Sequence, residues 1–337
     1  MVPTDKTPFT LRRATGTLAD GAAKLAGEIG STSVEAVLAQ ANRLAVKRGA
    51  SAAMGTMQPR PAEWYAFDQK DNDTPDWYPQ GLTCGEDSGQ VGVPVFVASW
   101  YFKPLGVVER GIRISFLSPQ TLKYQHALLV EAKPDGSYGP INIHAGGIAW
   151  YGDLLYVADT TRGLRVFDMN HLLDLRTVQK DLGDAKLIGR QGGRFNAFGY
   201  RYLLPQTDAW RLAASGPMFS FVSVDRSASP DLLVAGEYLE EGSAGRIARW
   251  SLDDMSLVDA FAMGQRKIQG GMSFKGRWYL SQAANAATNG RLLVDDGSGK
   301  VASRPFPLGP EDLCMQGGRL WSVTEFRNKR VIFGVSL

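Results

Sequence analysis

Six side chains that could move protons or orient a polar ligand lie close to the starts of predicted strands. They combine acids, amides, one imidazole and one phenol: Tyr78, Gln80, His144, Gln269, Glu311 and Asp312. Imidazole titrates near neutrality, and a carboxyl group can donate or accept a proton when its surroundings shift its pKa. The histidine and the two acids are therefore candidate catalytic groups, and the two amides and the phenol are candidate ligand-binding groups.

Each candidate catalytic residue also has a structural interpretation. His144, one of three histidines, could act as a general base or metal ligand, or could line a channel through hydrogen bonds. Glu311 and Asp312 are adjacent, so on a strand they point to opposite faces and do not form a matched carboxylate pair. One of them could face the axis as an acid, a base or a cation ligand, while the other makes local turn hydrogen bonds.

A second group of candidates follows the predicted second strands of two repeats. It consists of Trp100 and Tyr101 in VASWYFKP, and Glu325, Phe326 and Arg327 in VTEFRNK. If the first and last repeats are neighbours in a closed ring, these side chains form one aromatic and charged wall that suits a small organic ligand. The alternative is ordinary packing between sheets, with solvated loop tips.

An internal repeat supplies the elements that position these residues. Residues 146–168 read GGIAWYGDLLYVADTTRGLRVFD, and residues 270–295 follow the same plan of Gly-Gly, strand, Gly turn, strand, and a loop ending in Gly before a third strand. Further copies lie at 80–117, 217–252 and 311–335. Alignment of the five copies gives equivalent starts at Gln80, Gly146, Pro217, Gly270 and Glu311.

Repeated units of three or four short strands predict an all-β fold, a β-propeller with five blades. Six blades, and a β-sandwich with chance similarity between its strands, are the alternatives. KYQHALLVEA after residue 117 and the segment 185–204 would supply the fourth strands of the first two blades. The segment 63–68, EWYAFD, would pair with the last blade, close the ring and remove exposed sheet edges. The predicted propeller therefore spans residues 63–337.

Residues 1–62 are expected to form a small helical segment packed on the propeller. One helix would begin at its N-cap Ser33 and end near Gly49, with an apolar face, and a shorter helix over 17–29 would end at Gly30. A lid or a dimerisation arm is the alternative role for this segment.

Composition excludes several partners. The 337 residues carry 37 basic and 34 acidic side chains, for a net charge of +3, with no Lys/Arg block, so nucleic acid is not expected as a partner. No stretch approaches the ~18 consecutive apolar residues of a membrane span, so a soluble protein is expected. The N-terminus lacks the apolar region of a signal peptide. The protein is predicted to be cytoplasmic if Met1 is the native start, and extracellular if a signal peptide has been removed. The oligomeric state stays open.

The two cysteines, Cys84 and Cys314, do not occur in a zinc-binding pattern. In the repeat alignment Cys84 matches Trp150, whereas Cys314 matches Ala149. The one-residue offset places the two side chains on opposite sides of their sheets. This predicts two buried free thiols that lie apart and form no disulfide.

The repeat GGIAWYGDLLYVADTTRGLRVFD looks like the blades of the broad lactonase-like and NHL-like propeller group. GPED at 309–312 resembles the inner-strand acids of its gluconolactonase and strictosidine-synthase members. The resemblance covers about residues 63–337 and implies a single divalent cation in the central channel, held by acid and amide side chains. Glu311 or Asp312 would supply an acid. Gln80, Gly146 and Gly270 stand where the group has Asn ligands.

The leading functional prediction is an enzyme that acts on a small organic molecule at the channel mouth by acid/base chemistry, in hydrolysis or cyclisation. Glu311 or Asp312 would serve as the acid/base and His144 as its partner. The main alternative is a non-catalytic binding propeller that recognises a protein or glycan, and a structural assembly subunit is the third class. No nucleophile elbow, phosphate-binding loop, dinucleotide fingerprint or HExxH motif occurs in the sequence.

Overall fold

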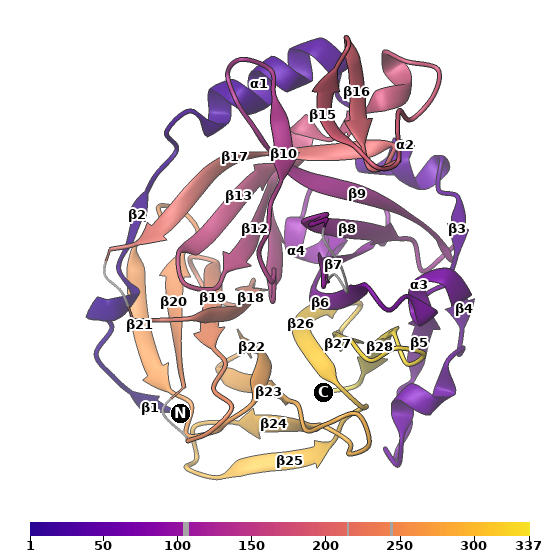
Figure 1. Cartoon of the computed structure of the whole chain (residues 1–337). Helices are drawn as coiled ribbons and strands as arrows, with labels where there is room; N and C mark the ends of the chain where they lie inside the picture. The colour runs from indigo at the N-terminus through magenta and orange to yellow at the C-terminus, as the bar shows by residue number, and fades with distance from the viewer. Residues whose placement is uncertain (104–107, 214–215, 243–244) are drawn as a thin grey trace.

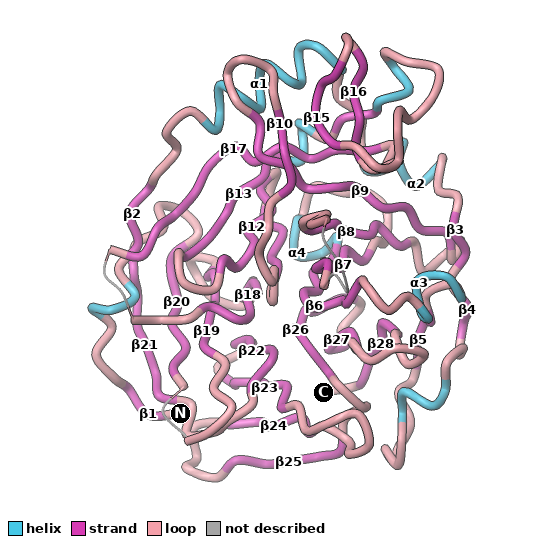
Figure 2. The backbone as a smooth tube through the Cα atoms, viewed as in Figure 1, coloured by secondary structure: helices cyan, strands magenta, loops and turns pink. Residues whose placement is uncertain are grey.

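The computed structural model describes residues 1–103, 108–213, 216–242 and 245–337. Within these residues, five blades of four main strands each are arranged around a common centre (Figure 1). Strands dominate the chain, and helices are few (Figure 2). The prediction of an all-β propeller with five blades is confirmed, and the described residues do not form a sixth blade or a sandwich.

The blades follow one another along the chain, each from its inner to its outer strand. Blade 1 contains β6 (Trp77–Cys84), β7 (Phe96–Phe102), β8 (Ile112–Leu117) and β9 (Lys123–Ala132). Blade 2 contains β11 (Ile148–Tyr151), β12 (Leu154–Asp159), β13 (Gly163–Asp168) and β17 (Tyr202–Leu212). Blade 3 contains β18 (Phe219–Asp225), β19 (Leu232–Glu237), β20 (Arg246–Ser251) and β21 (Leu257–Ala262). Blade 4 contains β22 (Ile268–Phe274), β23 (Arg277–Gln282), β24 (Arg291–Asp295) and β25 (Val301–Pro305).

Blade 5 takes its outer strand from residues that precede blade 1. Its first three strands are β26 (Pro310–Gln316), β27 (Arg319–Thr324) and β28 (Val331–Val335). The fourth is β5 (Glu63–Ala66), which pairs antiparallel with β28 so that Tyr65 lies opposite Ile332. Two segments from distant parts of the sequence thus complete one sheet and join the ends of the ring.

Glycine permits the inner strands to approach one another closely around the centre. A Cβ atom on Gly147, just before β11, would lie 2.1 Å from the backbone nitrogen of Val222 in β18. One on Gly270 in β22 would lie 2.6 Å from the carbonyl oxygen of Glu311 in β26. The paired glycines of the repeats therefore mark the places where neighbouring blades touch backbone to backbone.

Apolar side chains are buried between adjacent blades, because both faces of each sheet are covered. Between blades 5 and 1, Tyr65 stacks on Trp321 with ring centroids 6.0 Å apart, and Trp321 lies 4.5 Å from Phe96. Similar apolar clusters fill the other junctions. The core of this protein is thus divided into wedges, one for each junction.

Blade 2 differs from the prediction in its fourth strand. Only residues 202–204 of the predicted segment 185–204 belong to β17, and the rest contains a separate hairpin, β15 (Ile188–Gln191) and β16 (Arg194–Ala197). Gly192 and Gly193 both have positive φ, 56° and 78°, and form its two-residue turn. β17 is long enough to pair antiparallel with β13 and, at its start, parallel with β9, which joins blades 1 and 2.

The N-terminal segment runs around the outside of the propeller as a strap, defined here as residues 2–47 (Figure 1). Its strands are β1 (Val2–Pro3), β2 (Leu11–Arg13), β3 (Arg43–Leu44) and β4 (Val46–Lys47). They pair in turn with β21 of blade 3, β17 of blade 2, β9 of blade 1 and β5 of blade 5. The strap therefore borders the outer edges of four blades in the reverse of their chain order.

Two helices interrupt the strap. α1 (Leu18–Ile29) ends at Gly30 as predicted, and the φ of Gly30 is +88°. α2 begins as predicted, with Ser33 Oγ accepting a hydrogen bond of 3.2 Å from the Ala36 backbone N–H. It spans only Val34–Ala39, so its predicted extension to Gly49 is wrong, because the following residues pair as β3 and β4. Short elements complete the described chain: α3 (Gln69–Asp73), α4 (Gly85–Ser88), β10 (Tyr138–Pro140) and β14 (Leu173–Asp174). No helix in the described ranges is long and apolar enough to cross a bilayer.

Candidate functional site

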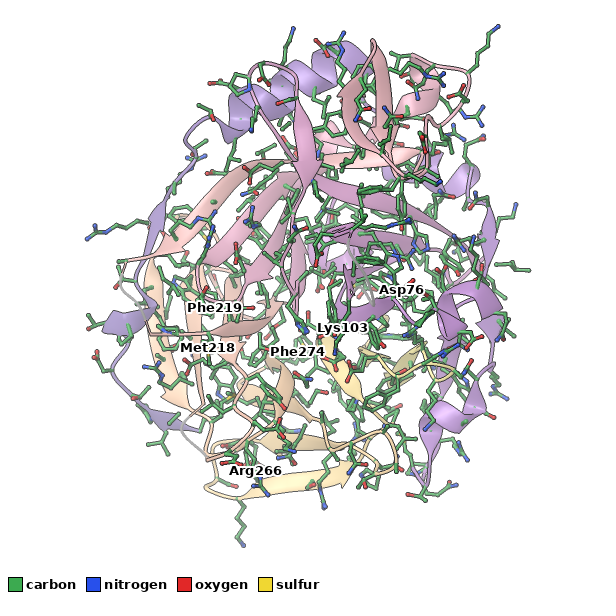
Figure 3. All side chains as sticks on the ribbon, in the orientation of Figure 1. Asp76, Lys103, Met218, Phe219, Arg266 and Phe274 are labelled. Atoms are coloured by element: carbon green, nitrogen blue, oxygen red, sulfur yellow. The ribbon has the colours of Figure 1, made fainter. Side chains whose placement is uncertain are left out.

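The starts of the inner strands and the ends of the second strands converge at one end of the propeller. The side chains that they bring together form what we call the mouth cluster: Tyr78, Gln80, Tyr101, His144, Gln269, Glu311 and Glu325. Lys103, which follows β7, lies near the centre of the ring in Figure 3. Blades 1, 2, 4 and 5 all contribute, so the cluster exists only in the closed ring.

Each of the two glutamates is held by an amide from a neighbouring blade. Gln80 Nε2 of blade 1 donates a hydrogen bond of 3.2 Å to Glu325 Oε2 of blade 5. Gln269 Nε2 of blade 4 donates one of 3.2 Å to Glu311 Oε1, also of blade 5. The amides orient the two carboxyl groups and leave each with a further oxygen for a ligand or a proton.

Aromatic rings form one wall of the cluster. The rings of Tyr78 and Tyr101 lie 5.6 Å apart, and the ring of Tyr101 lies 4.1 Å from that of His144 at an interplanar angle of 37°. Beneath Tyr78, the buried guanidinium of Arg330 lies 4.9 Å from the ring centroid. Such a wall offers flat apolar surface next to polar edges, which suits a ring-shaped organic ligand.

The surroundings of Glu311 favour its protonated form. Burial raises the pKa of its carboxyl well above the usual range, and the negative charges of Glu325 and Asp312 raise it further. Burial also raises the pKa of Glu325, although the hydrogen bond from Gln80 opposes this shift. Glu311 therefore holds a proton in the pH range where an exposed glutamate has lost it.

The His144 side chain is exposed to solvent and has a lowered pKa. Desolvation by the surrounding protein is the main cause of the lowered pKa, and the charge of Lys103 adds to the effect. The lowered pKa keeps the imidazole uncharged at neutral pH, so it is able to accept a proton.

Asp312 faces the inner strands and joins three blades. Its Oδ2 accepts hydrogen bonds from the backbone N–H groups of Leu82 in β6, at 3.2 Å, and of Ile148 in β11, at 3.0 Å. The carboxyl is fully buried, and its Oδ1 has no hydrogen-bond partner in the described part of the chain. Glu311 and Asp312 thus engage different partners, as expected for neighbours on a strand.

The remaining candidates are not all brought to the mouth. Trp100 is fully buried inside blade 1, where its Nε1 donates to Ser115 Oγ at 2.7 Å. Arg327 is exposed and pairs with Asp73 at 2.8 Å. Phe326 is half-buried and packs against Gly309. Of the expected five-residue wall, only Tyr101 and Glu325 belong to the mouth cluster.

Three residues near the cluster had not been singled out from the sequence. Lys103 lies close enough to His144 and Glu325 to affect the pKa of both, and Tyr238 interacts electrostatically with Glu311 and Glu325. Arg330 supports Tyr78 from below. Lys103 and Tyr238 follow second strands, as Glu325 does. A search of all five equivalent positions would therefore have found them.

The residues at the mouth do not fit the divalent cation that the resemblance implies. Glu311 Oε1 is bonded to Gln269, and one oxygen of Asp312 is taken by two backbone amides. Among the described residues, His, Cys, Asp and Glu ligand atoms come within 4.8 Å of one another in a group of three only at Cys84, Asp87 and Cys314. We therefore assign no step at the mouth to a metal.

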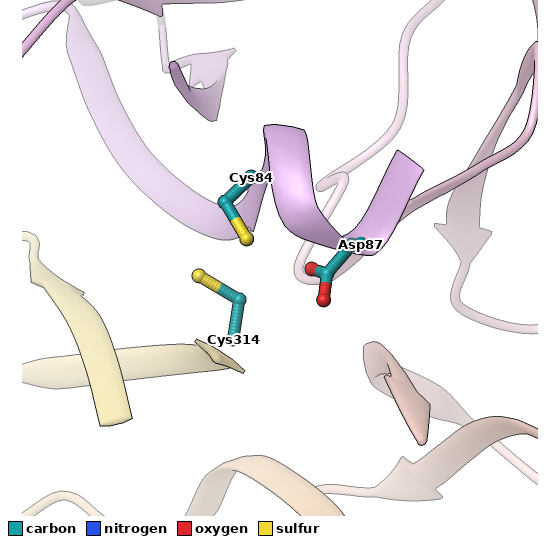
Figure 4. A group of neighbouring side chains, drawn as sticks. All are labelled: Cys84, Asp87 and Cys314. Atoms are coloured by element: carbon teal, nitrogen blue, oxygen red, sulfur yellow. The ribbon is translucent and has the colours of Figure 1, made fainter. Parts of the chain in front are cut away.

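The two cysteines face each other, which corrects the prediction that they lie apart (Figure 4). Both are buried free thiols, as predicted, and Cys84 Sγ donates to the Met315 carbonyl at 3.0 Å. The one-residue offset does place them on opposite faces of their own sheets. Adjacent blades stack with opposite faces in contact, however, so this offset brings the side chains together between blades 5 and 1.

No protein-family model matches the sequence, and no curated protein sequence matches it significantly. Solved structures with a similar fold include a gluconolactonase from Xanthomonas campestris, with 13% identity over 87% of this chain and 84% of that chain and a TM-score of 0.39. Luciferin-regenerating enzyme has 11% identity over 77% and 72% of the chains and a TM-score of 0.37. A GH43_1 enzyme from Xanthomonas citri has 9% identity over 94% and 93%, with a TM-score of 0.41. All three TM-scores are below 0.5, so the propeller assignment rests on the strand pairing described above.

Proposed function

We propose that the mouth cluster binds a small organic molecule and hydrolyses it by acid/base chemistry. One observation carries the proposal: a carboxyl group that favours its protonated form, Glu311, lies in the same cluster as a neutral imidazole, His144. A proton donor and a proton acceptor with opposite pKa shifts are the pair that such chemistry requires at neutral pH.

In the proposed reaction, Glu311 donates its proton to the leaving oxygen of an ester or acetal bond. His144 accepts a proton from the attacking water, so the two proton transfers balance. The negative charge of Glu325 supports Glu311 by favouring its protonated form. Gln80 and Gln269 fix the two carboxyl groups, and their amides are also suited to bind hydroxyl groups of the ligand. The wall of Tyr78 and Tyr101 favours a polyhydroxylated ring as the substrate.

The test is a turnover screen of the purified chain with lactones and chromogenic glycosides, followed by Glu311→Gln and His144→Gln. For a substrate that is turned over, we expect each variant to lower kcat by about 10²–10⁴-fold. Glu35→Gln, the same change at an exposed position of α2, is the matched control and should leave kcat unchanged. Full activity in both mouth variants would exclude these residues as the acid and base. Saturable ligand binding without turnover would instead support a binding propeller.

A further inference from the structure

A cavity of about 490 Å³ lies beside blade 1 and is lined by none of the mouth-cluster residues. Its walls come from four separate parts of the chain: strap residues 40–43, residues 70–77 around α3, strands β8 and β9, and residues 176–201. We call it the lateral cavity. Its volume is within the range of ordinary small-molecule sites.

Cationic side chains dominate the lining of the lateral cavity. Two carboxylates, Asp71 and Asp76, face six cations: Arg43, Lys70, Arg110, Arg113, Arg176 and Arg201. Asp71 is shared by Arg43, at 3.1 Å, and Arg113, at 2.9 Å, while Arg201 binds Asp174 through two hydrogen bonds.

Three cations of the cavity make no ion pair with the described part of the chain, although Arg176 Nη1 donates a hydrogen bond of 2.6 Å to the Lys180 carbonyl. Among the described residues, Lys70, Arg110 and Arg176 have no carboxylate within salt-bridge distance. The lining therefore carries more cationic groups than carboxylates.

Two of the guanidinium groups are held between aromatic rings. Arg113 is buried with its guanidinium 4.4 Å from the ring of Trp77 and 4.8 Å from that of Trp100, and its Nε has no hydrogen-bond partner in the described residues. Arg110 lies 5.8 Å from Phe102 and 5.4 Å from Phe198. Stacking fixes the plane of a guanidinium, so less entropy is lost when it binds an oxyanion through two parallel hydrogen bonds.

The floor of the cavity has the composition of a hydrolytic triad but not its accessibility. His126 Nε2 donates to Asp71 Oδ2 at 2.9 Å, and its Nδ1 lies 2.8 Å from Ser115 Oγ. Ser115 is fully buried and also accepts from Trp100, so a substrate cannot reach its hydroxyl. The hydrogen-bonded series Ser115–His126–Asp71 holds Arg113 in place, and its buried hydroxyl is not accessible for acyl transfer.

We propose that the lateral cavity binds a small organic anion that carries carboxylate or phosphate groups. The lining cations that lack a carboxylate partner attract the anion, and the in-plane N–H groups of Arg110 donate hydrogen bonds to its oxygen atoms. The amides of Gln40 and Gln125 line the same space and suit the polar remainder of such a molecule. This site is separate from the mouth cluster, and the proposal does not depend on the reaction proposed there.

Isothermal titration of the full chain with citrate and with inorganic phosphate, at constant ionic strength, tests the proposal. We expect saturable 1:1 binding of at least one probe, and the probe that binds more tightly identifies the preferred oxyanion. Arg110→Gln should weaken binding and raise the dissociation constant at least tenfold. Arg277→Gln, the same change at an exposed turn of blade 4, should leave it unchanged.

Several outcomes would overturn the proposal. One is the absence of a saturable binding isotherm with both probes. Another is an unchanged dissociation constant in Arg110→Gln. The third is an equal loss of affinity in Arg277→Gln, which would reveal general charge attraction. Lys70→Gln, at an exposed position of α3, provides a second variant if Arg110→Gln melts below the wild type. Turnover at the mouth is measured separately, so failure at one site is distinguishable from failure at the other.

Discussion

At the scale of single residues, buried charge is compensated around Asp71. Its carboxylate accepts from Tyr124 Oη at 2.6 Å, His126 Nε2 at 2.9 Å and Arg113 at 2.9 Å, and it pairs with Arg43. Burial alone would raise its pKa, but these partners together hold the pKa of Asp71 far below its usual range. The carboxylate therefore stays charged, and it anchors the floor of the lateral cavity.

Replacing Asp71 by Asn should be strongly destabilising, because the buried guanidinium of Arg113 would lose its counter-charge. We expect a loss of about 3–5 kcal/mol in the free energy of unfolding, measured by urea denaturation. Asp73→Asn is the matched control, since its ion pair with Arg327 is exposed and should contribute less than about 1 kcal/mol. Equal losses in the two variants would contradict the central role of Asp71.

The opposite pKa shifts at the mouth predict the pH profile of the proposed reaction. His144 must be neutral, and its lowered pKa places the acidic limb of kcat/KM below the ordinary histidine value of 6.5. Glu311 must be protonated, and its raised pKa moves the alkaline limb well above the ordinary glutamate value of 4.5. We expect activity to be highest between the two limbs. A rate that rises steadily through neutral and alkaline pH would argue against Glu311 as the proton donor.

At the scale of elements, the glycines of the inner strands set the spacing between blades. Gly147→Ala would push a methyl group into the backbone of Phe221 and Val222, which cannot move without separating blades 2 and 3. We expect a loss of about 1–3 kcal/mol, as for overpacked cores, with a lower melting temperature. Gly139→Ala, at a site with open space around it, should change stability by less than about 0.5 kcal/mol. A Gly147→Ala protein as stable as the control would show that the blades can move apart freely.

Elements that are determined by residues close together in the sequence could be predicted, and those that depend on pairing with distant segments could not. The repeated Gly turns and short strands are local, so the blades and their inner strands were predicted well. The helix over 33–49 was overestimated, because pairing of residues 43–47 with β9 and β5 overrides helix propensity. The contact of Cys84 with Cys314 was missed, because it depends on how neighbouring sheets stack.

The same distinction separates the two sites. The mouth cluster gathers equivalent positions of a repeat, so alignment alone identified all seven of its members. The lateral cavity is assembled from strap, loop and hairpin segments that share no repeat position. Its arginines therefore looked like ordinary surface charges, and nothing in their spacing distinguished them.

At the scale of the whole molecule, the strap covers the outer edges of β21, β17, β9 and β5. A variant without residues 1–47 would expose the hydrogen-bonding groups of four edge strands. We expect a lower melting temperature and concentration-dependent association, seen by light scattering. A variant without residues 1–6 uncovers only blade 3 and should show a smaller effect. A monomer with unchanged melting after the longer deletion would contradict this role of the strap.

The path of the strap also has a consequence for the order of synthesis. Its residues are synthesised before the strands with which they pair: β1 must wait for residues 257–262, and the β5 edge that receives β4 is itself completed by residues 331–335. The strap is thus synthesised before the blades but docks after them. The ring and its strap are complete only after residues 331–335 have been translated, and a nascent chain must be kept from pairing its free strands with other chains until then.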